Sequence, residues 1–204
     1  AGLPVLSTIK MLKQTGDEIV EIQGVLSGTL SYLFNTYDGS DSFASLVAQA
    51  RQKGYTEPDP RDDLSGLDVA RKLLILAREI GLTGELCDVE VENLTPESCR
   101  DFANVEEFLE RLRDHDHVFA ERLRVAQEAG NRLRYVAHLK DGKMGVRLES
   151  VDAAHPCYGL CGSDNLVAIR TRRYHDRPLV IQGPGAGAQV TAAGVLGDVL
   201  SCIE

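Results

Sequence analysis

The order of helical and strand-like patterns along the chain limits its fold more than any other feature. Between residues 6 and 129, apolar residues mostly recur at the spacing of a helix that buries one face. From residue 133 onward, apolar and polar residues alternate in short runs, as they do in strands. Because helices and strands are largely segregated, we expect an α+β fold with a mixed, largely antiparallel sheet and helices on one face.

The individual elements follow from these patterns and from the residues that stop them. We expect helices at residues 6–14, 28–38, 43–53, 65–80, 105–129 and 191–203, of which the fifth is either one long helix or a broken pair. We expect strands at residues 18–25, 89–94, 133–139, 146–151, 166–172 and 179–182, with a hairpin turn at Asp141-Gly142. Residues 55–63 are expected to form an ordered loop, because prolines in this segment disfavour a helix.

Charge and hydropathy exclude several classes of partner. The formal net charge of −9 and the pI near 5.1 oppose binding to nucleic acid or to an anionic membrane. The basic residues Arg170, Arg172 and Arg173 are interpreted as a solvated strand face. No run approaches the ~18 apolar residues that a membrane helix needs, and the first residues lack the layout of a signal peptide. We expect a soluble, cytoplasmic protein without a nucleic-acid or membrane partner.

The five cysteines are spread along the chain in an odd number, which does not indicate a disulfide framework. We therefore expect reduced thiols. Cys157 and Cys161 lie near His155, as some zinc ligands do. Zinc sites usually present a second ligand pair, and His175 alone is a poor candidate, so we do not expect a zinc site.

Two charged residues of the expected helix 65–80 have the spacing of a helical pair. Asp68 and Lys72 are four residues apart, which places them on one face, within reach of each other or of a shared ligand. Such a pair is also compatible with an ordinary surface ion pair that stabilises the helix by about 0.3–0.5 kcal/mol. Spacing alone does not decide between these interpretations.

The loop before this helix is crowded with carboxylates. Glu57, Asp59, Asp62 and Asp63 lie within seven residues, and such crowding is unfavourable unless the loop binds a cation or faces hydrogen-bond donors. The cluster indicates an ammonium or metal site. Alternatively, Asp62 and Asp63 serve as helix caps, since a helix begins directly after them.

A glycine-rich turn, GPGAGA, occupies residues 183–188 between the last expected strand and the last expected helix. Such a turn exposes backbone N–H groups that can approach a ligand closely. It matches G-x-G-x-x-A, but no second strand with an acidic residue follows, so it is not a dinucleotide fingerprint. The alternative is a tight connection with Gly187 packed against the sheet.

Three stretches resemble one enzyme family. They are GVLSGTLSYLFN at residues 24–35, GYTEPDPRDDLSGLDVARK at residues 54–72, and GPGAGAQVTAAGVLGDVL at residues 183–200. The chain resembles homoserine dehydrogenases, most of all the dehydrogenase end of bifunctional aspartokinase–homoserine dehydrogenases and the compact monofunctional forms. The resemblance implies an oxidoreductase that reduces L-aspartate 4-semialdehyde to L-homoserine with NADPH or NADH, in threonine and methionine biosynthesis. It does not decide between NADP and NAD.

The resemblance assigns roles to several residues. Lys72 matches the acid/base lysine of the family, and Asp68 matches the carboxylate that orients the substrate and assists proton movement. Glu57 matches the residue that receives the α-ammonium group of the substrate, helped by the backbone at Gly54. Gly185 matches a backbone contact to the cofactor.

The resemblance also implies a division of the chain. Residues 1–182 would form the substrate-binding and dimerisation domain, and residues 183–204 a turn and helix that return to a nucleotide-binding domain located before Ala1. A homodimer is expected, and the isolated chain is expected to have almost no activity. The backbone of Ala1 and Leu3 matches part of a site for a monovalent cation, which this chain would hold incompletely.

Two other functions remain open at this point. The chain could be a dimerisation or interaction module without independent activity. It could also be a sensor domain that binds an amino acid at the acidic loop.

Overall fold

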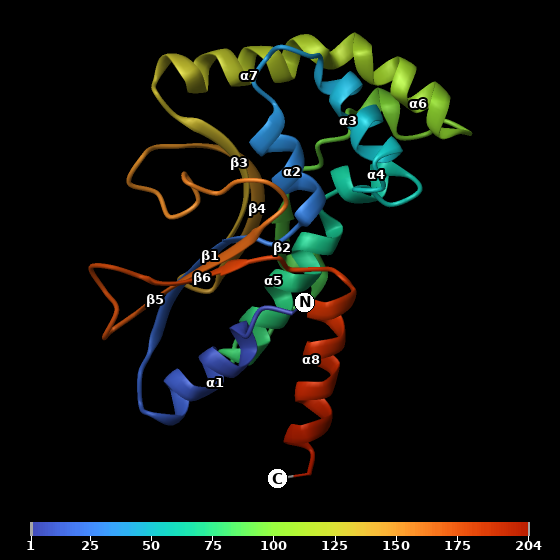
Figure 1. Ribbon diagram of the computed structural model, residues 1–204. Coiled ribbons are helices and arrows are strands. Elements are labelled where there is room, and N and C mark those ends of the chain that lie inside the picture. Colours follow the sequence, from blue (N-terminus) through green and yellow to red (C-terminus); the bar gives the residue numbers. More distant parts are fainter. Residues whose placement is uncertain (1, 204) are drawn as a thin grey trace.

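The computed structural model describes residues 2–203, which form a six-stranded sheet with helices against it (Figure 1). The strands are β1 (Ile19–Val25), β2 (Val89–Val91), β3 (Arg132–Lys140), β4 (Lys143–Val151), β5 (Asn165–Thr171) and β6 (Leu179–Gly183). Their order is β2-β4-β3-β1-β5-β6, and β2 pairs with β4 in parallel while all other neighbours are antiparallel. The expected α+β fold with a mixed, largely antiparallel sheet is confirmed.

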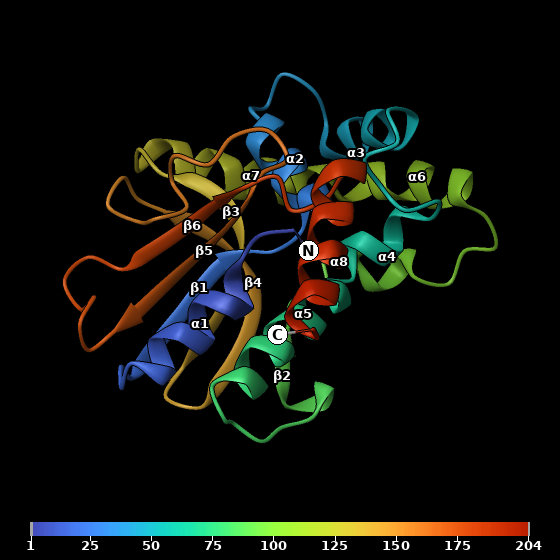
Figure 2. The ribbon, with the colours of Figure 1, turned by 60° about the horizontal axis from the view of Figure 1, so that its bottom comes forward.

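The helices lie mainly on one face of the sheet (Figure 2). They are α1 (Val5–Gln14), α2 (Gly28–Thr36), α3 (Phe43–Gln52), α4 (Pro60–Leu64), α5 (Leu67–Glu79), α6 (Val105–Leu112), α7 (Asp116–Glu128) and α8 (Ala188–Ser201). Three short 3₁₀ helices span Leu86–Asp88, Glu97–Cys99 and Arg113–His115. The opposite face is partly covered by the segment 152–164, which buries a small apolar cluster with β1 and β5.

The main core lies between the sheet and the helices. Every second residue of β3 points into it, including Leu133, Tyr135 and Leu139. Helix α5 contributes Leu73 and a further set of buried residues at helical spacing, namely Val69, Ala70, Leu74, Leu76 and Ala77. This amphipathic pattern fixes the rotation of α5 against the sheet, and therefore the direction in which its polar residues point.

The segment 55–63, expected as a loop throughout, is helical from Pro60. The carboxylate of Asp59 caps this helix by accepting a hydrogen bond from the amide of Arg61 at 3.0 Å. Proline is tolerated at the first helical position, because the missing N–H would have no partner there. Asp62 and Asp63 lie in the first turn of α4, where negative charge favours a helix, but neither caps α5, which has no side-chain cap.

Two helix starts shift by two or more residues from the expected ones, and the alternative left open for residues 105–129 is decided. Helix α5 begins at Leu67 instead of Ser65, because Gly66 adopts a left-handed conformation with φ of 72° just before it. Residues 105–129 form the broken pair α6 and α7, separated by the 3₁₀ turn Arg113–His115. Helix α8 begins three residues earlier than expected, at Ala188.

A buried arginine fastens the segment 152–164 to the sheet. Arg134 is 3% exposed, and burial lowers the pKa of its guanidinium. The guanidinium donates hydrogen bonds to five backbone carbonyls, those of Leu133, Phe34, Cys157, Tyr158 and Leu160, at 2.7–3.1 Å. A segment without regular structure is thus held by one side chain, whose planar fork of donors suits several acceptors at once.

Helix α8 extends away from the rest of the molecule, with the chain end at its tip (Figure 1). None of its described residues is buried, and Val195, Leu196, Val199 and Leu200 are between 52% and 60% exposed. No helix among residues 2–203 is long and apolar enough to cross a membrane. The start of α8 is held by the amino-terminal residues, since the amide of Gly2 donates to the carbonyl of Gly185 at 3.3 Å.

Candidate active site

Lys72 is held between two acceptors at the first turns of α5. Its Nζ atom lies 2.6 Å from Oδ2 of Asp68 and donates a hydrogen bond to the carbonyl of Leu26 at 3.0 Å. The side chains of Lys72 and Asp68 are 39% and 59% exposed, so the pair faces outward. An ammonium has three N–H donors, and the third has no acceptor among residues 2–203. This third donor is available to a ligand.

The backbone contact to Leu26 distinguishes Lys72 from an ordinary surface lysine. Leu26 follows β1 directly and precedes Ser27, whose side chain caps α2 by accepting from the amide of Leu30 at 3.2 Å. The segment between β1 and α2 is therefore held by the strand on one side and by the helix cap on the other. Its Leu26 carbonyl positions the Lys72 ammonium. No local pattern predicts this contact, apart from the Ser-Gly-Thr motif that starts α2.

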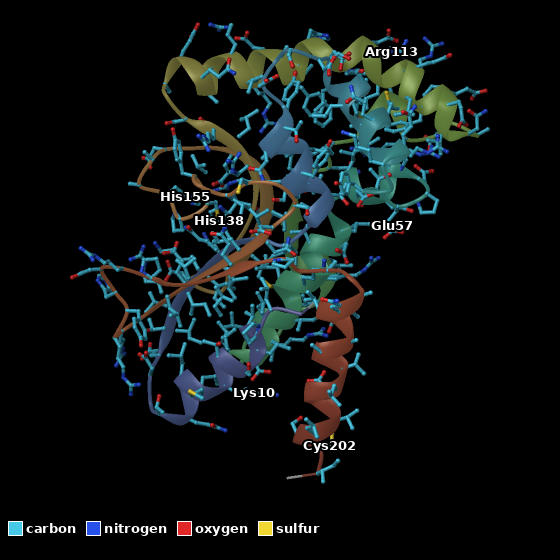
Figure 3. The ribbon with its side chains drawn as sticks, in the orientation of Figure 1. Lys10, Glu57, Arg113, His138, His155 and Cys202 are labelled. Carbon is cyan, nitrogen blue, oxygen red and sulfur yellow. The ribbon has the colours of Figure 1, made fainter. Side chains whose placement is uncertain are left out.

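Glu57 lies on the loop between α3 and α4, where Figure 3 labels it. Its backbone amide donates to Oδ2 of Asp63 at 2.8 Å, while its own side chain is exposed. The hydroxyl of Thr29, in the first turn of α2, donates to the carbonyl of Tyr55 at 2.7 Å. These bonds fasten the loop to the same helix start that holds Lys72, so the two predicted site regions are adjacent.

The carboxylate of Asp63 holds this loop through the Glu57 amide. Burial raises the pKa of its carboxyl, although the hydrogen bond from the Glu57 amide opposes the shift. The charge of Glu57 acts in the same direction as burial. Two neighbouring carboxylates of which one is half-buried create a negative potential that suits a cationic group.

Gly54 ends α3 with a φ of +72°, a conformation that glycine adopts without strain. Its amide donates to the carbonyl of Arg51 at 3.0 Å, and it is exposed. Gly54 thus sets the direction in which the chain enters the acidic loop. Its predicted backbone contact to the substrate stays a prediction.

The glycine-rich turn packs closely through Gly185 and not through Gly187. A Cβ atom on Gly185 would come within 1.6 Å of Oδ1 of Asn165, so the backbone of the turn lies directly against that amide. Gly187 has no atom within 4 Å of such a position and precedes the first residue of α8. The expectation that Gly187 packs against the sheet is wrong, because the strand β6 already ends at Gly183 and the turn leaves the sheet beyond it.

The predicted monovalent-cation site at Ala1 and Leu3 stays a prediction. Ala1 lies outside the described residues, and the carbonyl of Leu3 accepts a hydrogen bond from the amide of Val5 at 2.8 Å. Among residues 2–203, no group of three or more His, Cys, Asp or Glu side chains is arranged to hold a metal ion. All five cysteines are free thiols, and burial raises the pKa of Cys157 to about 12.

The basic residues once interpreted as a solvated face are paired. Arg170 lies 3.1 Å from Glu21, and Arg172 lies 2.5 Å from Glu18. Arg173 donates to the carbonyl and the hydroxyl of Thr15. Each of the three arginines thus has an acceptor within the described chain, while Arg172 stays 73% exposed, as expected for a solvated face.

Two surface hollows are lined by other residues. One of about 370 Å³ is lined by Phe102, Glu107, Glu110, Arg111 and Asp114, and one of about 300 Å³ by Ala48, Arg51, Gln52 and Leu109. Neither includes the lysine or the acidic loop. The candidate site is an open surface of this chain, bounded by the turn after β1, the acidic loop and the start of α5.

The model of the family described as homoserine dehydrogenase matches residues 4–200 of this sequence. That range covers nearly all of the chain, including Lys72, Asp68, Glu57 and Gly185. The chain belongs to the homoserine dehydrogenase family. The resemblance inferred from its motifs is confirmed.

Relatives in the family include stand-alone and bifunctional proteins. The homoserine dehydrogenase of Schizosaccharomyces pombe is 49% identical over 212 residues, covering 100% of this chain and 56% of that protein. A chloroplastic bifunctional aspartokinase/homoserine dehydrogenase of Zea mays is 49% identical over 202 residues, covering 98% of this chain and 22% of that protein. The chain thus spans about half the length of the stand-alone relative.

Solved structures share the fold. A Candida auris protein, titled as one of unknown function, superimposes with a TM-score of 0.93 at 43% identity, covering 98% of this chain and 58% of that one. A hyperthermophilic archaeal homoserine dehydrogenase in complex with NADPH has a TM-score of 0.70 at 24% identity, covering 98% of this chain and 52% of that one. The second likeness shows the common fold.

Proposed function

We propose that this chain is the substrate-binding part of an enzyme that reduces L-aspartate 4-semialdehyde to L-homoserine, a step toward threonine and methionine. The observation that carries the proposal is Lys72, whose ammonium is held by Asp68 and the Leu26 carbonyl with one N–H left free. This geometry supports Lys72 as the residue that acts on the aldehyde.

The reaction requires a hydride on the aldehyde carbon and a proton on its oxygen. As the hydride arrives, negative charge develops on that oxygen, and a positioned ammonium stabilises it and then protonates it. Lys72 supplies this proton, and Asp68 holds its Nζ in place. The carbonyl of Leu26 limits the lysine to one direction, which reduces the entropy lost on reaching the transition state.

The acidic loop supplies the binding contact for the other end of the substrate. The α-ammonium group meets the Glu57 carboxylate, with the backbone at Gly54 beside it. Asp63 holds the Glu57 backbone at 2.8 Å and adds negative potential. Substrate is thus recognised by its cationic group and transformed at its aldehyde.

The hydride donor is NADPH or NADH, which supplies the two electrons of the reduction. The archaeal relative named above was solved with NADPH. Residues of this chain fit such a group at the glycine-rich turn. Gly185 leaves no space for a side chain there, and the buried Nδ2 atom of the neighbouring Asn165 has no hydrogen-bond partner among residues 2–203. The choice between the two coenzymes would depend on the nucleotide-binding domain of the enzyme.

We further propose that residues 1–182 form the substrate-binding domain and that residues 183–204 return to a nucleotide-binding domain. The exposed aliphatic residues of α8, Val195, Leu196, Val199 and Leu200, support this division, because such a stripe is normally covered. We use the term complete enzyme for this chain together with the nucleotide-binding portion. A monovalent cation near Leu3 is a further proposal, which rests on the family resemblance.

The complete enzyme is also proposed to be a homodimer. Strand β6 is an edge of the sheet with unpaired backbone groups, and Val180 on it is 44% exposed. An interaction module without activity would use the same surfaces. The structure favours the enzyme, because an interaction module needs no lysine held by a backbone carbonyl.

The test is the oxidation of NADPH by the complete enzyme with L-aspartate 4-semialdehyde, followed at the absorbance of the reduced coenzyme. Turnover that depends on both compounds is expected, with almost none for residues 1–204 alone. A complete enzyme that dimerises but shows no turnover with either NADPH or NADH would contradict the proposal.

A further inference from the structure

Asn165 carries the buried amide group that lies beside the glycine-rich turn, and no specific contact has been assigned to it so far. It is the first residue of β5 and is 8% exposed, and its Nδ2 atom has no hydrogen-bond partner among residues 2–203. A buried N–H without a partner is unfavourable, because it gives up its bonds to water and gains none. Groups in this state are rare in folded proteins and call for a physical reason.

The strand pairing places Asn165 between the two halves of the site. Val25 of β1 pairs with Leu166 of β5, so the next residues along these antiparallel strands are Leu26 and Asn165. The carbonyl of Leu26 is the one that holds Lys72. On its other side, Asn165 pairs with Gly183 of β6. Asn165 therefore lies between the anchor of the catalytic lysine and the glycine-rich turn.

The side chain of Asn165 lies on the helix-covered face of the sheet. Successive residues of a strand point to opposite faces, and Val167 and Ile169 belong to the main core, whereas Leu166 and Ala168 belong to the cluster on the other face. Asn165 shares the face of Val167. This is also the face against which α5 packs, so the amide and the lysine lie on the same side of the sheet.

The segment leading into Asn165 is fixed by α2. The hydroxyl of Ser31 donates to the carbonyl of Asp164 at 2.7 Å, and the amide of Asn35 donates to the carbonyl of Gly162 at 2.9 Å. The contact of Asn165 with Gly185 restricts the side chain from above. The amide is therefore preorganised, as a group that orients a ligand must be.

We propose that Asn165 binds the coenzyme, with Nδ2 donating a hydrogen bond to the carbonyl oxygen of the nicotinamide carboxamide. The proposal rests on the dehydrogenase function proposed above. The carboxamide is bonded to the ring carbon next to the one that gives up the hydride, so it must lie close to the reacting aldehyde. A neutral N–H donor suits this neutral carbonyl, whereas the ammonium of the substrate offers no acceptor.

The test compares NADPH with its thionicotinamide analogue, in which the carbonyl oxygen is replaced by the weaker acceptor sulfur. Dissociation constants are measured by calorimetric titration of the complete enzyme without substrate, for wild type, Asn165→Leu and Asn165→Ser. The wild type is expected to bind NADPH more tightly than the analogue. Each substitution is expected to raise the Kd for NADPH about tenfold, and that for the analogue much less, because one hydrogen bond is lost.

Asn131→Leu, which changes an asparagine bonded to Ser150, is the matched control and should leave both constants unchanged. Asn165→Ser keeps the comparison possible if the leucine variant does not fold. If either variant raises the Kd for NADPH and for the analogue by the same factor, the amide only packs against Gly185, and the proposal is overturned. A raised KM for L-homoserine with unchanged coenzyme binding would assign the amide to the substrate and overturn it as well.

These outcomes are separable from a failure of the proposed function. The role of Asn165 alone is refuted if the wild-type enzyme binds NADPH and turns over, but the ratio of the Kd values for NADPH and the analogue is the same in the wild type and in the Asn165 variants. A wild-type enzyme with neither binding nor turnover refutes both.

Discussion

The carboxylate of Asp63 accepts a hydrogen bond from the backbone amide of Glu57, with 2.8 Å between the atoms, so a half-buried acid holds an exposed one in place. This hydrogen bond ties the loop that carries Glu57 to α4, the helix that contains Asp63. The pair divides the work of one site: one carboxylate fixes the backbone, and the other is free to meet a cation. Each role can be removed separately.

Replacing Asp63 by asparagine should alter the dependence of stability on pH. Because burial raises the pKa of Asp63 above its ordinary value of 3.8, the folded chain holds this proton more readily than the unfolded chain. Stability contributed by the protonated group is then lost as pH rises from 3.8 through the raised pKa. Asp63→Asn keeps an acceptor for the Glu57 amide and removes this loss. Urea unfolding from pH 3 to pH 7 should show the variant gaining on wild type as pH rises, and a constant difference would refute the explanation.

Lys72→Ala and Glu57→Ala should affect different kinetic constants of the complete enzyme. Lys72 meets charge that appears only in the transition state, so its loss should lower kcat by ~10²–10⁴-fold with a smaller effect on KM. Glu57 meets an ammonium that is charged throughout, so its loss should act mainly on KM. Asp68→Asn should fall between them, since it keeps the shape but loses the charge. Steady-state kinetics decide the matter, and near-normal kcat in Lys72→Ala would reduce the lysine and Asp68 to a surface ion pair.

Gly185→Ala should destabilise the chain through one contact. The new Cβ would meet Oδ1 of Asn165 at 1.6 Å, and relief of such overpacking typically costs about 1–3 kcal/mol. In the Asn165→Ala background that oxygen is gone, so the same substitution should cost much less. A double-mutant cycle from urea unfolding measures this coupling. Gly159→Ala, where a Cβ meets no atom within 4 Å, is the control. Additive effects would mean that the two residues do not restrict each other.

Arg134→Met should loosen the segment 152–164. The substitution keeps an apolar stem but leaves several buried carbonyls without their donor, at about 1–3 kcal/mol for each group that water cannot reach. We expect a lower midpoint of urea unfolding and new protease cleavage within 152–164. Arg134→Lys should rescue little, because its three donors do not match the fork. Unchanged protease resistance in both variants would show that the segment is held by its apolar cluster.

The isolated chain should be a homodimer at micromolar concentration, since β6 leaves a sheet edge unpaired. Light scattering measures this directly. A single species of 22.3 kDa would contradict the expectation. A charged residue in place of Val180, on the exposed edge, should shift the equilibrium toward the monomer if the edge is the contact.

Most elements could be predicted because their signals are local. The alternation in β4 and the apolar stripe of α5 each arise from burial of one face, which the sequence displays directly. Boundaries were less accurate where a single residue decides them, as Gly66 does at the start of α5 and Pro60 at the start of α4. Proline disfavours a helix interior but favours its first position, so the same residue supports opposite predictions.

The candidate site could be predicted only in part. The Asp68 and Lys72 pair follows from helical spacing, and the structure brings the two within 2.6 Å. The Leu26 carbonyl and the Asn165 amide could not be predicted, because they approach the site through strand pairing between distant parts of the chain. Contacts of this kind have no signature in local sequence.

The bond between the Gly2 amide and the Gly185 carbonyl joins the beginning of the described chain to the base of α8. Any domain connected through both of these points is attached by two adjacent crossings at one corner, beside Asn165. Such an attachment would oppose sliding more than rotation and would serve as a hinge. A nucleotide-carrying domain on this hinge would swing toward Lys72 or away from it, and the corner itself would hardly move.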